Sequence, residues 1–346
     1  MNSYALCVLH ITSACNLRCK HCYASAGKKR PDEMTMDEIR SVIDQIHDMG
    51  INYVTVSGGE PLMHEHFYEI LEYISKRNMN TMITTNGTLL DDGAVKRIKA
   101  LGVDSVQISL DSPVAETHDR FRGLQGAFQR SVEGVRLCKE NGLKVSIMST
   151  LSEINKNSVQ ELLDFAYSLR PNGIAIERFV PEGRGSAKRE LGVSGADLRR
   201  CLELLNAYSE KYPDCKFSTN DPLAVFVGNK NRYALQAVEE GMPLCGGCSI
   251  GRMAFGITPV GEVVLCTRLY QSVGSIRDAA ISDILHDSVL VNRLCDRSNL
   301  KGRCGKCRYK CICGGCRGWA YGSTGDHFES DSLCWLTDEE IGIAKA

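Results

Sequence analysis

The stretch ITSACNLRCKHCYASAG, residues 11–27, places Cys15, Cys19 and Cys22 within eight residues near the start of the chain. On one loop, thiolates with the spacing C-x3-C-x2-C can converge on a single metal centre. A structural zinc site normally has four protein ligands, whereas a catalytic metal keeps one coordination position open. Three local ligands therefore favour an open, catalytic iron-sulfur centre after the first strand. A zinc ion with a remote fourth ligand is the alternative.

The composition argues against several classes of protein. The chain has 346 residues, a formal net charge of -1 and no basic stripe of the kind that binds nucleic acid. Its start lacks a secretion signal, and no apolar run approaches the roughly 20 residues that span a bilayer. Seventeen cysteines in a reducing compartment indicate metal or redox chemistry rather than disulfides. We therefore expect a cytoplasmic protein with no nucleic-acid or membrane partner.

An alternation of apolar strand, loop and amphipathic helix fills the first half of the chain. Thr35 and Glu38 have the spacing of a capping box at the start of the first helix. Strands that alternate with helices imply a parallel sheet, either doubly wound or an open (β/α)6 barrel, with the chemistry at the carboxyl ends of the strands. The expected strands are 4–12, 51–57, 81–85, 105–110, 144–150 and 173–180.

The cysteine spacing resembles the signature of the radical S-adenosylmethionine (SAM) superfamily. In that family the three thiolates, here Cys15, Cys19 and Cys22, hold a [4Fe-4S] cluster, and its open iron binds the amino and carboxylate groups of SAM. The resemblance implies an α/β fold, a partial (β/α)6 TIM-type barrel followed by a small cysteine-rich iron-sulfur domain. It also implies an enzyme that cleaves SAM reductively to a 5′-deoxyadenosyl radical.

Three further motifs match the family at the ends of expected strands: SGGEP at 57–61, TNG at 85–87 and ISLDS at 108–112. The resemblance implies that Glu60 receives the SAM ammonium through a charge-assisted hydrogen bond. Asp111 would approach the ribose or the carboxylate, although it is equally explained as a turn or helix cap. The implied SAM-binding set is His21, Tyr23, Ser57, Gly58, Gly59, Glu60, Asn86, Ser109 and Asp111.

The cysteine-rich C-terminal part resembles a SPASM domain, which holds two auxiliary [4Fe-4S] clusters. A zinc ribbon is the alternative for its C-x2-C pairs. The segment 253–266 is expected to form a hairpin that returns Cys266 to its cluster. The expected domains are a radical SAM barrel over 1–212 and a SPASM domain over 213–346. On the family's pattern Cys245, Cys248, Cys266 and Cys316 would bind the first auxiliary cluster, and Cys304, Cys307, Cys313 and Cys334 the second.

Cys311 lies between two of the expected ligands. It is either a bystander, which we favour, an alternate ligand, or a free thiol that donates a hydrogen atom to a substrate radical. A donor at this position would make the enzyme an epimerase.

The segments RFVPEGRG (178–185) and CGGCRGWAYGSTGD (313–326) resemble those of the heme and mycofactocin branch, and peptide-modifying members share them. We expect a ribosomal peptide or protein substrate that is cross-linked, oxidised or epimerised, narrowly ahead of a tetrapyrrole or other small cofactor whose side chain is oxidised. A non-catalytic iron-sulfur electron carrier is a third alternative.

Two kinds of protein partner follow from this reading. A radical SAM enzyme needs a reductant such as flavodoxin or ferredoxin. The expected barrel begins within a few residues of Met1, so a peptide substrate would be bound directly or through a separate leader-peptide recognition protein.

Overall fold

The computed structural model describes residues 4–228, 232–240, 242 and 246–343. In this part of the chain ten strands form one sheet, in the order β10-β9-β8-β1-β2-β3-β4-β5-β6-β7. The pairs from β8 through β1 to β7 are parallel, and the β8-β9 and β9-β10 pairs are antiparallel. The strands are β1 (Leu6–His10), β2 (Tyr53–Ser57), β3 (Asn80–Thr85), β4 (Ser105–Ser109), β5 (Lys144–Leu151), β6 (Gly173–Arg178), β7 (Lys216–Ser218), β8 (Ala254–Ile257), β9 (Glu262–Cys266) and β10 (Leu269–Ser275).

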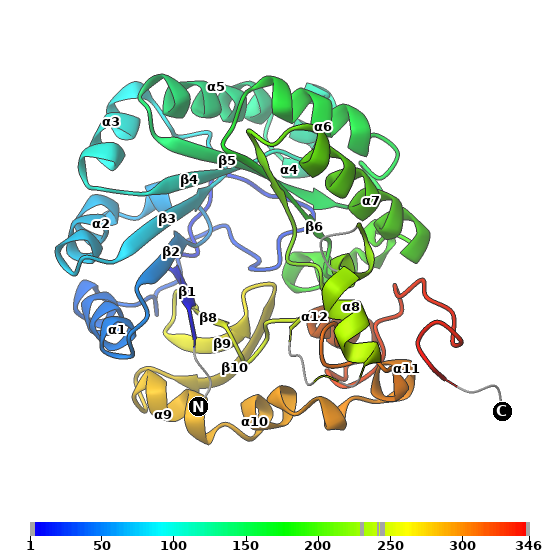
Figure 1. The fold of residues 1–346 in the computed structure, drawn as a ribbon. Coiled ribbons are helices and arrows are strands. Elements are labelled where there is room, and N and C mark those ends of the chain that lie inside the picture. The colour runs from blue at the N-terminus through cyan, green and yellow to red at the C-terminus, as the bar shows by residue number, and fades with distance from the viewer. Residues whose placement is uncertain (1–3, 229–231, 241, 243–245, 344–346) are drawn as a thin grey trace.

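The six strands predicted from the sequence are confirmed as β1 to β6, to within two residues at either end. They pair in chain order, and the helices between them lie on the outside of a curved sheet (Figure 1). In a doubly wound sheet the strand order would reverse and helices would cover both faces. The fold is therefore the partial TIM-type barrel of the two alternatives.

The first helix begins at the predicted capping box. The Thr35 side chain accepts from the Glu38 backbone, and the Glu38 side chain accepts from the Thr35 backbone. No helix in the described residues is long and apolar enough to cross a membrane. The helices are α1 (Met36–Asp48), α2 (Phe67–Lys76), α3 (Asp92–Ala100), α4 (Ala115–Arg122), α5 (Ala127–Glu140), α6 (Val159–Ser168), α7 (Gly195–Lys211), α8 (Arg232–Glu239), α9 (Ile281–Asp287), α10 (Val289–Cys295), α11 (Gly302–Lys306) and α12 (Arg317–Thr324).

The alternation of side chains along each strand separates the apolar core from the inside of the barrel. In β4, for example, Val106 and Ile108 are fully buried in the core cluster that the helices cover. Between and beyond them, Gln107 and Ser109 point the other way and line a cavity inside the barrel. The sheet therefore turns one set of its side chains, with polar ones such as Gln107 and Ser109 among them, toward a cavity inside the barrel.

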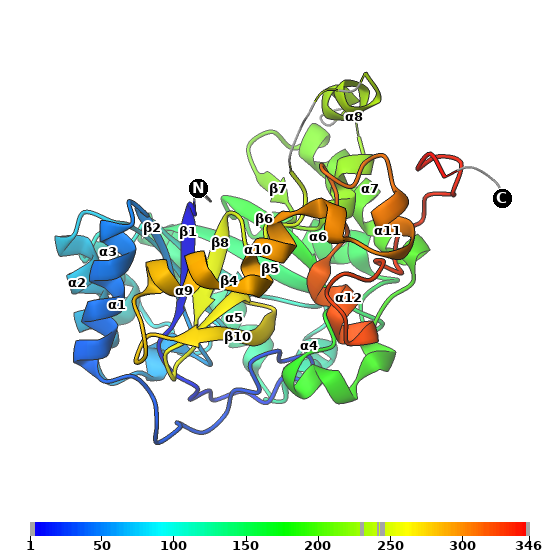
Figure 2. The same ribbon diagram turned by 90° about the horizontal axis from the view of Figure 1, so that it is seen from below.

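The C-terminal part extends the same sheet. β8 pairs in parallel with β1, and the predicted hairpin is confirmed, because β8 and β9 are antiparallel and Gly261 N–H donates to Thr258 O over 3.0 Å at the turn. β7 to β10 all lie beyond residue 212. The sheet therefore continues beyond residue 212, and the expected division into two domains stays a prediction (Figures 1 and 2).

Candidate active site

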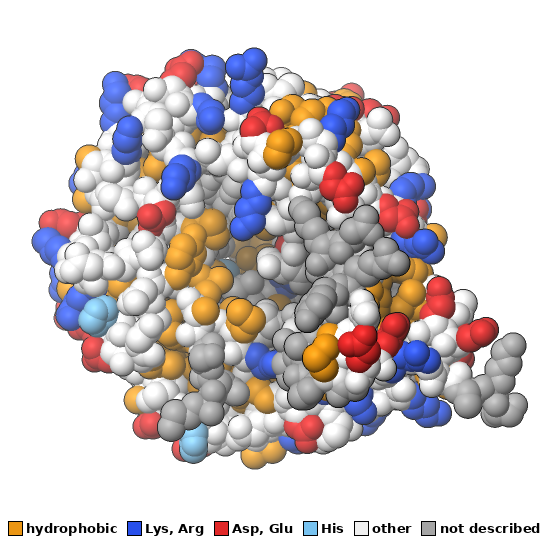
Figure 3. All heavy atoms as spheres, viewed as in Figure 1, with side chains coloured by type: hydrophobic (Ala, Val, Ile, Leu, Met, Phe, Trp, Pro, Cys, Tyr) orange, Lys and Arg blue, Asp and Glu red, His pale blue; other side chains and the backbone are white. Residues whose placement is uncertain are grey.

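The loop after β1 carries Cys15, Cys19 and Cys22 across the carboxyl ends of the strands, on the side away from the N-terminus in Figure 2. Two hydrogen bonds close its base: Cys15 N–H donates to Gly27 O over 3.0 Å, and Gly27 N–H to Ser13 O over 2.8 Å. All three thiols line one cavity of about 400 Å³, and none is in a disulfide. In the view of Figure 3 the molecule is hollowed near the middle of the barrel.

The glycines of SGGEP pack directly against this loop. Gly59 N–H donates to Thr12 O over 2.7 Å, and Glu60 N–H donates to Ala14 O over 2.8 Å. A Cβ on Gly58 would lie 2.6 Å from Thr12 O, and one on Gly59 would lie 2.3 Å from Ala14 O. Because no side chain fits at either position, the two glycines fix the distance between the cysteine loop and the end of β2.

The carboxylate of Glu60 points into the protein. Its Oε1 accepts from the Thr85 hydroxyl over 2.7 Å and from Leu62 N–H over 3.3 Å, and its Oε2 accepts from Asn86 N–H over 2.8 Å. The side chain is fully buried and is not among the described residues that line the cavity. Burial raises the pKa of Glu60 to about 7, and its hydrogen bonds oppose the shift. In this structure the Glu60 carboxylate joins SGGEP to TNG, and its expected contact with the SAM ammonium stays a prediction.

We expect Glu60→Gln to destabilise the cluster-loaded protein even without SAM. The amide nitrogen would face donors that now meet an acceptor, and a buried donor left unpaired costs about 1–3 kcal/mol. The measurement is the unfolding midpoint, with the exposed Glu339→Gln as control, for which no change is expected. An unchanged midpoint together with weaker SAM binding would instead identify Glu60 as a ligand of SAM.

Asp111 is also turned away from the cavity. Its Oδ2 accepts from Arg122 Nε over 2.7 Å, and its Oδ1 accepts from Thr150 N–H over 2.8 Å. Burial acts to raise the pKa of Asp111, but Arg122 together with His21, His118 and the Thr150 N–H outweighs it and holds that pKa below its usual value. Arg122 itself lines the cavity, with Nη1 3.9 Å from Cys19 Sγ. The sequence analysis missed Arg122, because a single arginine in an amphipathic helix has no spacing signal.

The other expected SAM-binding residues do gather around the cysteines. His21 stacks on Phe121, with ring centroids 4.2 Å apart, and burial lowers its pKa to about 3, so the ring is neutral. The Asn86 side chain donates to Asn16 Oδ1 over 2.9 Å, which joins the TNG turn to the cysteine loop. The members of the predicted set that line the cavity are His21, Tyr23, Ser57, Gly58, Gly59, Asn86 and Ser109.

A second segment holds the cysteine loop from the side of β6. It is the short helix η2 (Gly183–Ala187), which begins in the GRG motif. Arg184 Nε donates to Cys19 O over 2.8 Å, and both Nη atoms donate to Ala26 O over 3.1 and 3.2 Å. The backbone N–H of Arg184 donates to Cys22 O over 2.9 Å. The motif therefore fixes the loop at three carbonyls, a role that its sequence did not indicate.

We expect Gly183→Ala to reduce the iron held by the cysteine loop. Gly183 has a φ of 55°, and a Cβ there would lie 2.0 Å from Tyr23 O, so the loop would have to shift. Gly50→Ala is the matched control, because Gly50 has a φ of 76° and open space around its Cβ position. The control should cost about 1–2 kcal/mol of backbone strain alone. Iron content and absorbance of both variants are the measurement; equal iron retention would contradict the prediction.

Seven of the eight cysteines expected to bind auxiliary clusters are described, and they lie in two groups. One small pocket is lined by all four cysteines that are expected to bind the second auxiliary cluster: Cys304, Cys307, Cys313 and Cys334. In the first expected set, burial raises the pKa of Cys266, and that of Cys316 to about 12, and the thiol of Cys248 adds to both shifts. Cys245 lies outside the described residues.

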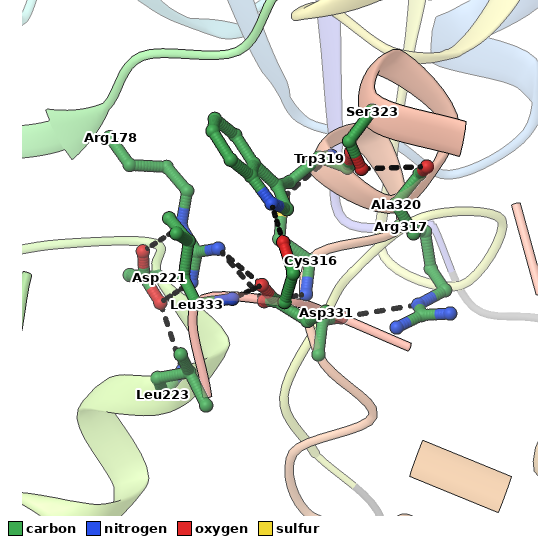
Figure 4. Close-up of polar contacts among 12 residues, drawn as sticks. Arg178, Asp221, Leu223, Cys316, Arg317, Trp319, Ala320, Ser323, Asp331 and Leu333 are labelled. Carbon is green, nitrogen blue, oxygen red and sulfur yellow. Dashed lines mark hydrogen bonds and ion pairs between the residues drawn. The ribbon is translucent and has the colours of Figure 1, made fainter. Parts of the chain in front are cut away.

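A buried ionic network contacts both groups, and Figure 4 shows the part of it around Cys316. Arg178 at the end of β6 donates from Nη2 to Asp221 Oδ1 over 2.6 Å and from Nη1 to Asp331 over 2.8 and 3.0 Å. Asp331 also accepts from Cys316 N–H over 2.8 Å, and its own N–H lies 3.4 Å from Cys304 Sγ. One aspartate therefore contacts a cysteine of each group and an arginine of the barrel.

Cys311 is placed apart from the cavity. It is half-buried in the turn before Cys313, and its carbonyl accepts from Gly246 N–H over 2.9 Å. It is not among the described residues that line the barrel cavity. A thiol that returns hydrogen to a substrate radical has to reach that radical, so this position favours the role of bystander for Cys311.

Comparison with known proteins assigns the family. The model of the Radical SAM superfamily matches residues 9–166, from β1 into α6. An AdoMet-dependent heme synthase of Methanosarcina barkeri is 32% identical over 96% of this chain and 97% of its own length. The chain belongs to the radical SAM superfamily. It is an enzyme, and the resemblance seen in the sequence is confirmed.

Other relatives of this radical SAM enzyme carry different names. An Fe-coproporphyrin III synthase of Methanosarcina barkeri is 29% identical over 98% of this chain and 90% of its own length. A mycofactocin maturase MftC of Mycobacterium ulcerans is 29% identical over 88% of this chain and 81% of its own length. The fold matches that of Streptococcus suis SuiB bound to S-adenosylmethionine, with a TM-score of 0.76 and 21% identity over 96% of this chain and 78% of that one.

The radical SAM family implies SAM and a [4Fe-4S] cluster, and the residues of the cavity fit both. Three thiols face it from one loop. Burial raises the pKa of Cys15 to about 11, so the thiol gives up its proton only when a metal takes the thiolate. Gly58 and Gly59 of SGGEP line the same cavity, and because they have no side chain a ligand can approach their backbone closely.

Proposed function

We propose that this radical SAM enzyme oxidises a side chain of an iron tetrapyrrole. The observation that carries the proposal is the match to a heme synthase along nearly the whole of both chains. The Fe-coproporphyrin III synthase matches over a similar length, whereas the mycofactocin maturase covers less of this chain. These relatives reverse the order expected from the sequence, in which a peptide came first.

In this proposal SAM, when bound and reduced, supplies a 5′-deoxyadenosyl radical that removes one hydrogen atom from the substrate. Cys15, Cys19 and Cys22 hold the cluster at the carboxyl ends of the strands. Polar groups at the ends of β2 to β4 hold SAM, among them Ser57, Asn86 and Ser109. The walls determine which hydrogen is reached and exclude water. Their apolar members include Leu6, Val8, Met82, Met148, Phe179 and Val180.

We also propose that the C-terminal cysteines hold two auxiliary [4Fe-4S] clusters, with the two ligand sets expected from the sequence. The pocket shared by Cys304, Cys307, Cys313 and Cys334 supports the second set. Cys266 lines the barrel cavity, so a cluster of the first set would adjoin the substrate. Such a cluster could accept the electron that remains on the substrate after hydrogen abstraction. A flavodoxin or ferredoxin is the proposed reductant. The proposed location is a reducing cytoplasm, since all sixteen described cysteines are free.

Modification of a ribosomal peptide is the second candidate. The mycofactocin maturases among the relatives favour it. A separate leader-peptide recognition protein would belong to this alternative.

The test is an anaerobic assay of the cluster-loaded protein with SAM, reduced flavodoxin and Fe-coproporphyrin III. We expect 5′-deoxyadenosine to form faster than without the tetrapyrrole, together with a tetrapyrrole product of altered mass. Stimulation by peptides alone would support the second candidate. No 5′-deoxyadenosine under any condition would leave only an electron carrier.

A further inference from the structure

Arg268 differs from the other arginines of the barrel cavity in its position, because its ion pair with Glu177 joins β6 to the connection between β9 and β10. Four arginines line the cavity among the described residues: Arg122, Arg178, Arg184 and Arg268. Arg178 and Arg184 use Nε and both Nη atoms in hydrogen bonds to carboxylates or carbonyls. Arg122 donates hydrogen bonds to the carboxylate of Asp111 and to the thiol of Cys19. In the same described set, Arg268 donates from Nη1 to Glu177 Oε2 over 3.0 Å, and its side chain also hydrogen-bonds the Cys266 thiol.

The position of Arg268 suits a substrate contact. It lies two residues after Cys266, in the connection from β9 to β10, and Glu177 lies on β6. Strand order places β6 and β9 near opposite ends of the sheet, so this ion pair spans the seam where the barrel closes. SGGEP, TNG and Ser109 end β2, β3 and β4 in the middle of the sheet. A ligand between the two walls would meet SAM on one side and Arg268 on the other.

The ion pair of Arg268 and Glu177 is partly exposed to the cavity, as a site that binds an anionic ligand has to be. The Arg268 side chain is 22% exposed and Glu177 is 9% exposed. Because Arg268 lines the cavity, this remaining surface is available to a ligand inside it. Glu177 also accepts from Asn220 N–H over 2.7 Å, so its carboxylate is fixed and in turn orients the guanidinium. A guanidinium carries five N–H groups, so N–H groups remain beyond the contacts of Arg268 with Glu177 and Cys266, and an oriented guanidinium matches a carboxylate in a two-hydrogen-bond arrangement.

We propose that Arg268 binds a carboxylate of the substrate and that Glu177 positions it. The proposal rests on the proposed function for the choice of tetrapyrrole, because propionate side chains supply such carboxylates. The same chemistry would serve a carboxylate of a peptide. In both cases the carboxylate would lie beside Cys266, and the carbon atoms next to it would face the SAM side of the cavity.

The test measures a preference rather than an affinity. Cluster-loaded wild type and Arg268→Gln are titrated with Fe-coproporphyrin III and with its tetraamide, which has the same size and no carboxylates. We expect the wild-type protein to bind the acid about tenfold to a hundredfold more tightly than the tetraamide, which is the usual contribution of a charge-assisted hydrogen bond to affinity. The variant should lose this preference while its affinity for the tetraamide, its iron content and its SAM affinity stay unchanged. Arg199→Gln, at an exposed pair on α7, is the control.

A second pair of probes separates this inference from the proposed function. The peptide hexaalanine and its C-terminal amide are titrated in the same way. A preference for the peptide acid that depends on Arg268, without tetrapyrrole binding, would sustain the carboxylate site and refute the tetrapyrrole substrate. No preference for either acid in wild type, or a preference that survives Arg268→Gln, would overturn the inference.

Discussion

Replacing Cys15, Cys19 and Cys22 together by alanine is expected to abolish SAM cleavage and to remove about four of about twelve irons per chain. The three thiols are the cysteines of the loop that crosses the carboxyl ends of the strands, and all face the cavity. Without them the cluster has no ligands, so no electron reaches SAM. Iron analysis and 5′-deoxyadenosine formation after anaerobic reconstitution are the measurements.

The control for this variant removes three thiols elsewhere. Cys7, Cys138 and Cys201 are buried at 0%, 0% and 1% exposure in the apolar core. Their triple replacement by alanine should retain all of the iron and SAM cleavage, at some cost in packing. Loss of all iron from the Cys15, Cys19 and Cys22 variant would contradict the proposed auxiliary clusters. Retention of SAM cleavage would contradict the assignment of the site.

Arg178→Met is expected to destabilise the cluster-loaded protein by about 3–5 kcal/mol, which is the usual cost of removing one partner from a buried ion pair. The Arg178 side chain has no exposed surface and faces Asp221 and Asp331, which are 1% and 0% exposed. The variant would leave two buried carboxylates without their cation. Methionine has a similar length, so the effect of lost packing is small.

The pH dependence of this loss separates charge from packing. Burial acts to raise the pKa of Asp221, but the charge and hydrogen bonds of Arg178, together with the Leu223 N–H and Arg268, outweigh it and hold that pKa below its usual value. In wild type this pair therefore stabilises the protein above about pH 4 and loses its effect as the pH falls through the lowered pKa. Without Arg178, burial alone would raise the carboxylate pKa, so the deficit should be larger at pH 8 than at pH 5.

The measurement is the unfolding midpoint at both pH values. Arg136→Met, at an exposed pair on α5, is the control and should leave the midpoint unchanged. An equal loss at both pH values would mean that Arg178 acts through packing alone.

The sequence determined the parts of this protein that depend on local spacing. The three cysteines within eight residues identified the cluster loop, and the Thr35–Glu38 capping box and six apolar strands appeared where their patterns predicted. Such features are set by neighbours in the chain, because helices, turns and metal loops close over a few residues. The glycines of SGGEP belong here too, although only the structure shows that they face Thr12 and Ala14.

The tertiary structure decided which polar groups meet. Arg178 and Asp331 are 153 residues apart, Arg184 and Cys19 are 165 apart, and Glu177 and Arg268 are 91 apart. It also turned Glu60 inward, toward Thr85 and Asn86. A single arginine or carboxylate has no period that a sequence could reveal. Its partner is fixed only when closing the sheet brings β6 beside the C-terminal cysteines, in a dry interior where an unpaired charge is too costly to persist.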